Sequence, residues 1–201
     1  RRRQVPLVYD SHEVQTSRTG YGRTVFLLER WLNRYVDAFL CENEMRAEYT
    51  ATLYGMAPPV PIHNYPEFRS IESIRAERAD LHGLLGLPGD EPILLYQGGL
   101  QAGRGLEQLL EATPSFRRGT VVLLGDGRLK PHLLSRTAEL GLSDRVRFVD
   151  RVPVETLLAY TANAYLGFQV LNNICFNHYS ALSNKLFEYM MCGVPVIACD
   201  F

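Results

Sequence analysis

Residues 93–106 read Ile93-Leu94-Leu95-Tyr96-Gln97-Gly98-Gly99-Leu100-Gln101-Ala102-Gly103-Arg104-Gly105-Leu106, and this stretch decides the class of fold. Its apolar beginning, residues 93–96, has the length of a buried strand. The glycines that follow permit a tight turn, and Leu106 opens a segment with helical spacing. A strand, a glycine-rich turn and a helix in this order are typical of a parallel sheet flanked by helices.

The same alternation of strand-length apolar runs and helix-period segments continues along most of the chain. It predicts an α/β fold with doubly wound parallel sheets. We expect helices over 22–35, 44–54 and about 74–85, the second of them ended by Gly55. The other expected strands are 5–10, 38–41, 121–124, 146–149, 165–170 and 194–198.

Prolines and a change of pattern between residues 57 and 92 suggest a boundary between two domains. We expect a first domain over 1–66, a linker with a helix over 67–92 and a second domain over 93–201. The first domain has too few strands to close a sheet alone, and the second ends directly after a strand. Because the chain also lacks an initiator Met, we expect a piece truncated at both ends.

Composition excludes several classes of protein. The 201 residues are 46% hydrophobic, which rules out a mainly disordered chain. The formal charge of -1 gives no bulk attraction to nucleic acid, so we expect no nucleic-acid partner. The uncharged apolar stretch 190–199 is interrupted by Gly193 and Pro195 and is too short to span a membrane.

Cysteine spacing and arginine placement bear on location. No CxxC pattern occurs among Cys41, Cys175, Cys192 and Cys199, so we expect reduced thiols in a cytoplasmic protein. The arginines at positions 1–3, 18 and 23 could support peripheral contact with anionic lipid on the inner membrane face, although scattered arginines are more often simply solvated.

The turn after residue 97 has the residue types of a phosphate-binding loop. Its glycines, Gly98 and Gly99, would let backbone amides approach an oxyanion, and Arg104 could add charge-assisted bonds. The spacing imitates a P-loop, but Arg104-Gly105 replaces the Lys-Ser/Thr that such a loop needs, which excludes an ATPase of that type. A plain tight turn remains the alternative.

A second glycine turn, Gly125-Asp126-Gly127, follows the strand expected at 121–124. Doubly wound sheets place ligands at the carboxyl ends of their strands, so this turn is a second candidate for ligand contact. The alternative is that Asp126 caps the next helix.

Residues 183–197 carry the most informative pattern. Lys185 and Glu188 stand three apart on one helix, near its start, while Leu182, Leu186, Tyr189 and Met190 would form its buried face. Lysine suits a phosphate, and an ionised carboxylate can accept two hydrogen bonds from sugar hydroxyls. The alternative is an i,i+3 ion pair on a solvated face.

His12 follows the first expected strand and could bond a substrate oxygen or move a proton. A hydrogen-bonded loop histidine is the alternative. Asp10 and His12 could suggest a metal pair, but we find no third ligand with suitable spacing, so no metal is expected.

Taken together, these features resemble the retaining nucleotide-sugar glycosyltransferases of the family 4 type (glycosyl transferases group 1), whose GT-B architecture consists of two facing Rossmann-like domains. The resemblance rests above all on residues 183–189 and 193–197. It is supported by the residues 8–13, 64–66, Gly98 with 104–105, and 125–127.

The resemblance implies that the second domain binds the sugar nucleotide and that the first mainly binds the acceptor. It gives His12 and Lys185 catalytic roles, with His12 approaching the transferred sugar and Lys185 assisting at the diphosphate or sugar. Glu188 matches the residue that holds the ribose hydroxyls, and Arg104 one that neutralises the diphosphate. The implied donor-binding residues are Gly98, Gly99, Arg104, Gly125, Gly127, Asn184, Lys185 and Glu188.

Two positions depart from the family pattern. Many members carry a second glutamate, contacting the donor sugar, where this chain has Ser180, and a basic residue where it has Gly99. Asn177, His178 or the loop backbone could hold the sugar instead.

The resemblance thus implies a metal-independent hexosyltransferase that uses a nucleotide-diphosphate sugar as co-substrate, requires no cofactor, and acts in glycan biosynthesis on a glycan or lipid-linked acceptor. We do not expect the present chain to turn over efficiently. The alternatives are a GT-B-like nucleotide-sugar 2-epimerase and a non-catalytic nucleotide-sugar-binding module.

Overall fold

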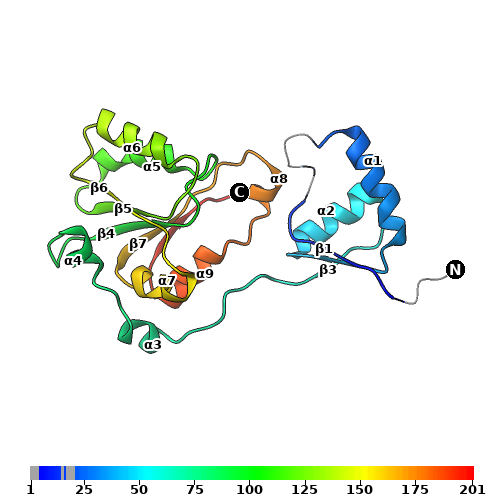
Figure 1. Cartoon of the computed structure of the whole chain (residues 1–201), viewed down its shortest axis with the longest axis horizontal. Coiled ribbons are helices and arrows are strands. Elements are labelled where there is room, and N and C mark those ends of the chain that lie inside the picture. Colours follow the sequence, from blue (N-terminus) through cyan, green and yellow to red (C-terminus); the bar gives the residue numbers. More distant parts are fainter. Residues whose placement is uncertain (1–4, 15, 17–20) are drawn as a thin grey trace. The chain divides into compact units, whose positions relative to one another are not determined.

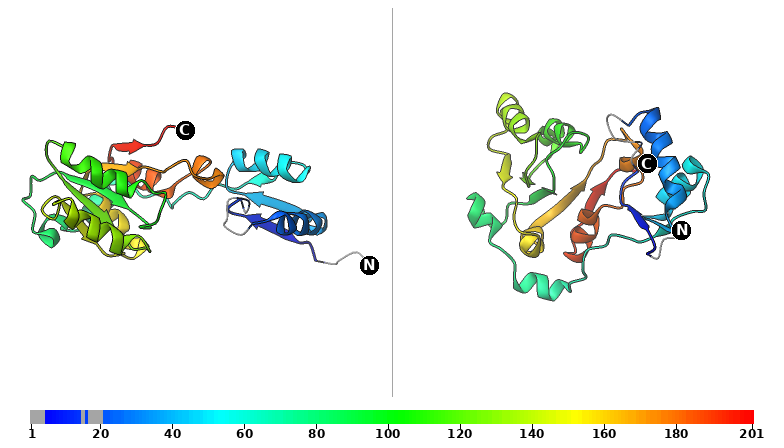
Figure 2. Two further views of the ribbon diagram at one scale, coloured as in Figure 1. Left: turned by 90° about the horizontal axis from the view of Figure 1, so that it is seen from above. Right: turned by 45° about the vertical axis from the view of Figure 1, so that its right-hand side comes forward.

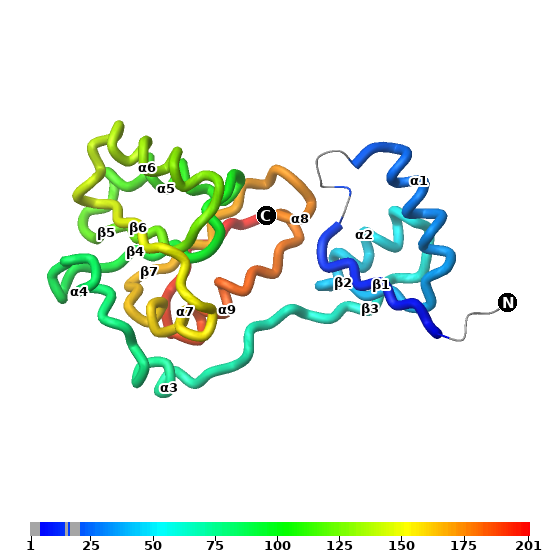
Figure 3. The backbone as a smooth tube through the Cα atoms, viewed as in Figure 1, coloured from blue at the N-terminus to red at the C-terminus, as the bar shows by residue number. Residues whose placement is uncertain are grey.

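The computed structural model describes residues 5–14, 16 and 21–201. The chain divides into two compact units, which are drawn in Figure 1. The first unit consists of Arg1–Tyr65 and Asn173–Leu182, and the second of Pro66–Asn172 and Ser183–Phe201. The segment 173–182 can be followed along the chain in Figure 3, between the end of one strand and the start of a helix of the second unit.

The first unit is built on a parallel three-stranded sheet with the order β1-β2-β3. Its helix over residues 44–54 has the predicted bounds, because the Asn43 side chain accepts a hydrogen bond from the backbone N–H of Arg46 and Gly55 ends the helix with a φ of 64°. In chain order its elements are β1 (Val8–Ser11), α1 (Arg23–Leu32), η2 (Asn33–Tyr35), β2 (Ala38–Cys41), α2 (Glu44–Tyr54), β3 (Val60–Pro61) and α8 (Phe176–Tyr179).

Three features of the first unit differ from expectation. Strand β1 begins at Val8 rather than at residue 5. Strand β3 was not predicted, because proline removes a hydrogen-bond donor, yet two residues suffice to pair with the end of β2. The helix expected over 22–35 divides into α1 and the 3-10 turn η2, and among the described residues its apolar face is half-exposed, with Trp31 packed edge-to-face on Tyr35.

The second unit contains a parallel five-stranded sheet with the order β6-β5-β4-β7-β8. The strands after β4 are added first on one side of it and then on the other, so the sheet is doubly wound as predicted. In chain order its elements are α3 (Ile71–Ala76), α4 (Leu81–Leu85), β4 (Ile93–Gln97), α5 (Leu106–Ala112), η3 (Thr113–Ser115), β5 (Thr120–Leu124), α6 (Lys130–Glu139), β6 (Val146–Val149), α7 (Val154–Thr161), β7 (Ala164–Gln169), α9 (Asn184–Met191) and β8 (Val196–Ala198).

Both faces of this sheet are covered, which explains why its central strands read as continuous apolar runs. Side chains alternate along a strand, so Leu94 and Tyr96 enter one core with α5 and α6, whereas Ile93 and Leu95 enter the other with α7 and α9. Figure 2 shows these helices on the two faces of the sheet.

Two helical expectations for the second unit need correction. The single helix expected over about 74–85 is two short helices, because Asp80 caps the second of them through the backbone N–H of Gly83. In α9 the buried residues are Lys185 and Tyr189, followed by the buried C-cap Cys192, and Met190 is 64% exposed. The predicted buried face is therefore right at Tyr189 and wrong at Met190, and Lys185 is buried although the prediction left it out.

Within the described residues, no helix is both long and apolar enough to cross a membrane. All four cysteines have free thiols, and two of them, Cys41 and Cys192, are buried. The arginines at positions 1–3 and 18, which the lipid hypothesis used, lie outside the described residues.

Candidate nucleotide-sugar site

The sheet of the second unit has its topological switch point between β4 and β7, because the chain winds outward from β4 in one direction and from β7 in the other. Loops that leave neighbouring strands in opposite directions open a crevice at the carboxyl ends of those strands, where ligands of doubly wound sheets bind. The loop after β4 begins at Gly98, and the chain leaves β7 at Gln169. Both predicted glycine turns lie at this carboxyl edge.

The two glycine turns pack directly against each other. Gly125 has a φ of 146°, and a Cβ at this position would lie 2.0 Å from the carbonyl oxygen of Gly98. A Cβ at Gly127 would likewise lie 2.2 Å from the carbonyl oxygen of Leu100. The backbone N–H of Leu100 donates to the carbonyl of Asp126 over 2.9 Å. These glycines therefore fix the shape of the edge, whatever they contribute to a ligand.

Asp126 does not cap a helix, which was the alternative for this turn. Its Oδ1 accepts from the backbone N–H of Gly127 over 2.8 Å, whereas α6 begins at Lys130 without a side-chain cap. Beside the turn lies a hollow of about 370 Å³ with charged side chains of both signs in its lining. It is lined by Gly98, Gly99, Gln101, Leu124, Gly125, Asp126, Arg151, Val152, Val154 and Leu157.

Lys185 is 8% exposed and points toward the turn after β4. Its Nζ lies 3.4 Å from Oη of Tyr96, which in turn donates to the carbonyl of Gly99 over 3.0 Å. A Cβ on Gly98 would stand 3.4 Å from Cε of Lys185, at van der Waals contact, so this side chain lies directly against the turn. The Lys185 side chain thus lies against the candidate phosphate-binding turn.

Burial and a neighbouring charge perturb the titration of this cluster. Desolvation, followed by repulsion from Arg104, lowers the pKa of Lys185 to about 7. Burial raises the pKa of Tyr96 to about 12, and the charge of Arg104 opposes that rise. Arg104 therefore acts electrostatically on both groups, and the three side chains form one cluster. An anion placed there would favour the charged form of Lys185.

Glu188 and Lys185 have different hydrogen-bond partners. Its Oε2 accepts from Nε2 of Gln97 over 2.6 Å, and Oε1 of Gln97 accepts from Oγ1 of Thr161 over 2.7 Å. Burial raises the pKa of Glu188, while the bond from Gln97 and the charge of Lys185 lower it. The alternative of an i,i+3 ion pair on a solvated face is wrong, since Lys185 is buried and no ion pair within the described residues joins the two.

Gln97 was missed as a site residue. The sequence predicts a strand that ends at residue 96 and a glycine turn that begins at residue 98, yet Gln97 is the last residue of β4 and is buried. The available signal was a polar residue at the end of a strand that is apolar on both faces, because a buried amide needs partners of its own.

Two buried acceptors near the same edge have no hydrogen-bond partner among the described residues: Oδ1 of Asn184 and Oε1 of Gln169. Asn184 is the first residue of α9, and Gln169 is the last residue of β7. Buried polar atoms are nearly always hydrogen-bonded, so unpartnered acceptors at a sheet edge suit a ligand that brings hydroxyl donors.

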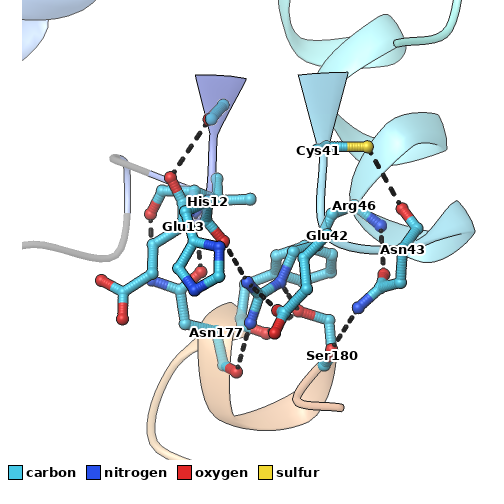
Figure 4. A network of polar contacts seen from close by, with 11 residues as sticks. His12, Glu13, Cys41, Glu42, Asn43, Arg46, Asn177 and Ser180 are labelled. Atoms are coloured by element: carbon cyan, nitrogen blue, oxygen red, sulfur yellow. Dashed lines mark hydrogen bonds and ion pairs between the residues drawn. The ribbon is translucent and has the colours of Figure 1, made fainter. Parts of the chain in front are cut away.

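His12 lies in the first unit, directly after β1, as predicted, and its side chain is exposed. Its backbone carbonyl accepts from Nη1 of Arg46 over 2.5 Å (Figure 4). Asn177 is an alternative sugar contact. Its Oδ1 accepts from the backbone N–H of Val14 over 2.9 Å, and its Nδ2 donates to the carbonyl of Val14 over 3.1 Å. Within the part of the chain that the structure describes, no group of three or more potential metal ligands is assembled.

Comparison with known proteins assigns a family. Residues 91–201, more than half of the chain, match the family described as Glycosyl transferases group 1. The chain is 41% identical over 212 residues to alpha-D-kanosaminyltransferase of Streptomyces kanamyceticus, covering 98% of this chain and 53% of that protein. It is 27% identical over 216 residues to D-inositol 3-phosphate glycosyltransferase of Saccharomonospora viridis, covering 96% and 48%.

Solved structures agree on the fold. HepE of Anabaena, in a crystal structure with UDP-glucose, superposes with a TM-score of 0.70 at 21% identity, covering 96% of this chain and 53% of that one. The chain spans about half the length of the curated relatives it matches. Its two parallel α/β units are those of the GT-B fold. The chain belongs to the glycosyl transferases group 1 family.

Proposed function

We propose that the chain forms the donor site of a retaining, metal-independent glycosyltransferase, which moves a hexosyl group from a nucleoside-diphosphate sugar to a glycan or lipid-linked acceptor. One observation carries the proposal. At the switch point of a doubly wound sheet, α9 presents a buried Lys185 toward a glycine-rich turn and a partly buried Glu188 whose carboxylate is held by Gln97. A cation and an oriented carboxylate on one helix suit the diphosphate and the ribose of one nucleotide.

The diphosphate is assigned to the turn after β4. Backbone amides near Gly98 and Gly99, with Arg104 and Lys185, would bind it. When the bond between the anomeric carbon and the β-phosphate oxygen breaks, negative charge grows on the departing diphosphate. Groups that bind this charge more tightly in the transition state than in the ground state accelerate the reaction. Lys185, with its pKa near 7, becomes fully charged where the diphosphate needs it.

The ribose is assigned to Glu188, with Gln97 as a positioning residue. Gln97 occupies one carboxylate oxygen, and Thr161 fixes the amide so that its NH₂ group faces the glutamate. The other oxygen has no hydrogen-bond partner among the described residues and is left for the ribose hydroxyls. Asn184 and Gln169, with their unpartnered oxygens, are candidates for further hydroxyl contacts.

The first unit is assigned to the acceptor, with His12 at the transferred sugar. Two relatives, a kanosaminyltransferase and a D-inositol 3-phosphate glycosyltransferase, support sugar transfer. The UDP-glucose complex of HepE makes a uridine nucleotide the first donor to test. Free thiols on all four cysteines support a cytoplasmic setting.

Transfer to water tests this function without knowledge of the acceptor. The chain is incubated with UDP-, GDP- and ADP-hexoses labelled with ¹³C at C1, in the presence of EDTA, and the released sugar is followed by NMR. Release first as the α-anomer, from an α-linked donor, is expected of a retaining transferase. Release of the C2 epimer would show an epimerase instead. Saturable binding with no release, by a chain extended to the full length of its relatives, would show a binding module.

A further inference from the structure

Arg46 joins three separate stretches of the first unit. It lies in α2, is 4% exposed, and forms an ion pair with Glu42. Its Nε donates to Oγ of Ser180 over 3.0 Å, and its Nη1 donates to the carbonyl of His12 over 2.5 Å. Its Nη2 donates to the carbonyl of Asn177 over 3.2 Å. Figure 4 shows the guanidinium at the centre of this network.

Such an arrangement uses what is particular to arginine. The guanidinium is planar and offers five N–H donors in a fixed geometry, so partners on all sides are held in one relative position. A buried cation also requires a counter-charge, which Glu42 supplies. Lysine would keep the charge but could not reach the same partners from one rigid plane.

The segment 173–182 has further attachments in the first unit. Nδ2 of Asn43 donates to the carbonyl of Ser180 over 2.9 Å. Asn177 exchanges two hydrogen bonds with the backbone of Val14. The rings of Phe176 and Tyr49 stack with their centroids 4.0 Å apart. The segment is thus fastened along most of its length.

These contacts use the one hydrogen that the Ser180 hydroxyl can donate. Its Oγ accepts from Arg46 and donates to the carbonyl of Phe176 over 2.8 Å, its carbonyl accepts from Asn43, and the residue is 6% exposed. A serine hydroxyl has a single O–H to donate. At the position where many family members have a sugar-binding glutamate, this chain has an internal anchor.

We propose that Arg46 is a positioning residue, which fixes the backbone at His12 and fastens the segment 173–182 through Ser180, and that Ser180 is not a ligand of the donor sugar. The catalytic part of the proposal rests on the function proposed above, because it takes His12 as the residue that approaches the sugar. Ser180 is four residues before Asn184, where α9 begins, so the anchored backbone leads directly into the helix that carries Lys185 and Glu188.

Hydrogen exchange followed by mass spectrometry tests the anchoring on the whole chain. Arg46→Lys and Ser180→Ala are expected to raise exchange at least tenfold in peptides that cover 173–182, and Arg46→Lys also in peptides that cover 8–14. Arg34→Lys, an exposed arginine of the same unit, is the control and should change neither. Unchanged exchange in both variants, or an equal rise throughout the chain, would overturn the anchoring.

Kinetics and affinity test the functional part. Arg46→Lys should lower the rate of donor hydrolysis at least tenfold while the donor KM stays within twofold, a split that general destabilisation would not produce. Ser180→Ala should leave unchanged the ratio of affinities for the nucleotide sugar and its nucleoside diphosphate. A fall of that ratio by tenfold would make Ser180 a sugar ligand and overturn the proposal.

The two proposals fail in different ways. If no nucleotide binds to any folded variant, the proposed donor site is wrong, whereas the exchange result still decides whether Arg46 anchors the segment. If Arg46→Lys does not fold, Ser180→Ala carries both readouts, since it removes one hydroxyl and leaves the ion pair of Arg46 with Glu42 in place.

Discussion

Binding of a nucleoside diphosphate should draw a proton onto Lys185. Burial lowers the pKa of this amine to about 7, so about a tenth of it is protonated at pH 8. A bound diphosphate favours the ammonium form. If it restores an ordinary lysine pKa, binding takes up close to one proton at pH 8 and only about a tenth of a proton at pH 6.

The same linkage predicts how affinity depends on pH. The bound state holds more protons than the free state above pH 7, so affinity falls as the pH rises. From a free pKa of about 7, the dissociation constant should increase by up to roughly 50-fold between pH 7 and pH 9. At these values the phosphate groups of the ligand, with a second pKa of about 6, are already largely deprotonated and contribute little.

Calorimetric titration at pH 8 in two buffers of different ionisation enthalpy measures the uptake directly. The observed binding enthalpy should differ between the buffers by nearly the difference in their ionisation enthalpies. Lys185→Met should remove this difference, and Lys130→Met, at the only other lysine of the chain, should retain it. Tight binding without any dependence on buffer, or a dependence that survives in Lys185→Met, would refute the placement of Lys185 at the diphosphate.

Three further predictions concern single residues of the account. Gln97→Leu should weaken nucleoside-diphosphate binding by about tenfold in calorimetry, because it removes the bond that orients Glu188; full affinity would show that the bond is dispensable. Gly125→Ala should lower the free energy of unfolding by more than about 3 kcal/mol in urea denaturation, since it combines backbone strain with a clash on Gly98, whereas Gly141→Ala, at a positive φ in open space, should cost about 1 to 2 kcal/mol. His12→Ala should reduce donor hydrolysis far more than donor affinity, and equal losses of both would point to a binding role.

The sequence predicts the sheet of the second unit well because each strand there is a short apolar run bounded by glycine or a polar turn. The same reasoning places Gly98, Gly125 and α9 at one edge, since parallel strands share the direction of their carboxyl ends. It errs at two positions of α9, because Lys185 is buried and Met190 is exposed. A charged side chain is expected to be exposed unless a buried partner is known. The partner of Lys185 is Tyr96, which lies on a strand distant in sequence.

The polar contacts of the first unit could not have been predicted. Arg46 looks like an ordinary helical arginine, and its partners at positions 12, 177 and 180 are remote in sequence. The grouping of 173–182 with the first unit likewise depends on such long-range bonds. Local periodicity reports which face of an element is apolar, but it carries no information on which distant polar groups satisfy one another.

The most direct test of the donor site is a calorimetric comparison of one nucleoside diphosphate, the best binder among UDP, GDP and ADP, with its 2′,3′-dideoxy analogue. Both are titrated into the folded wild-type chain and into Glu188→Gln. Because loss of hydrogen bonds to a charged acceptor costs about 1.5 to 3 kcal/mol, the substitution should weaken the natural nucleotide about tenfold or more and leave the dideoxy analogue within about twofold. Equal losses for the two ligands, or no binding of any nucleotide by the folded chain, would contradict the assignment of Glu188 to the ribose and of this sheet edge to the donor.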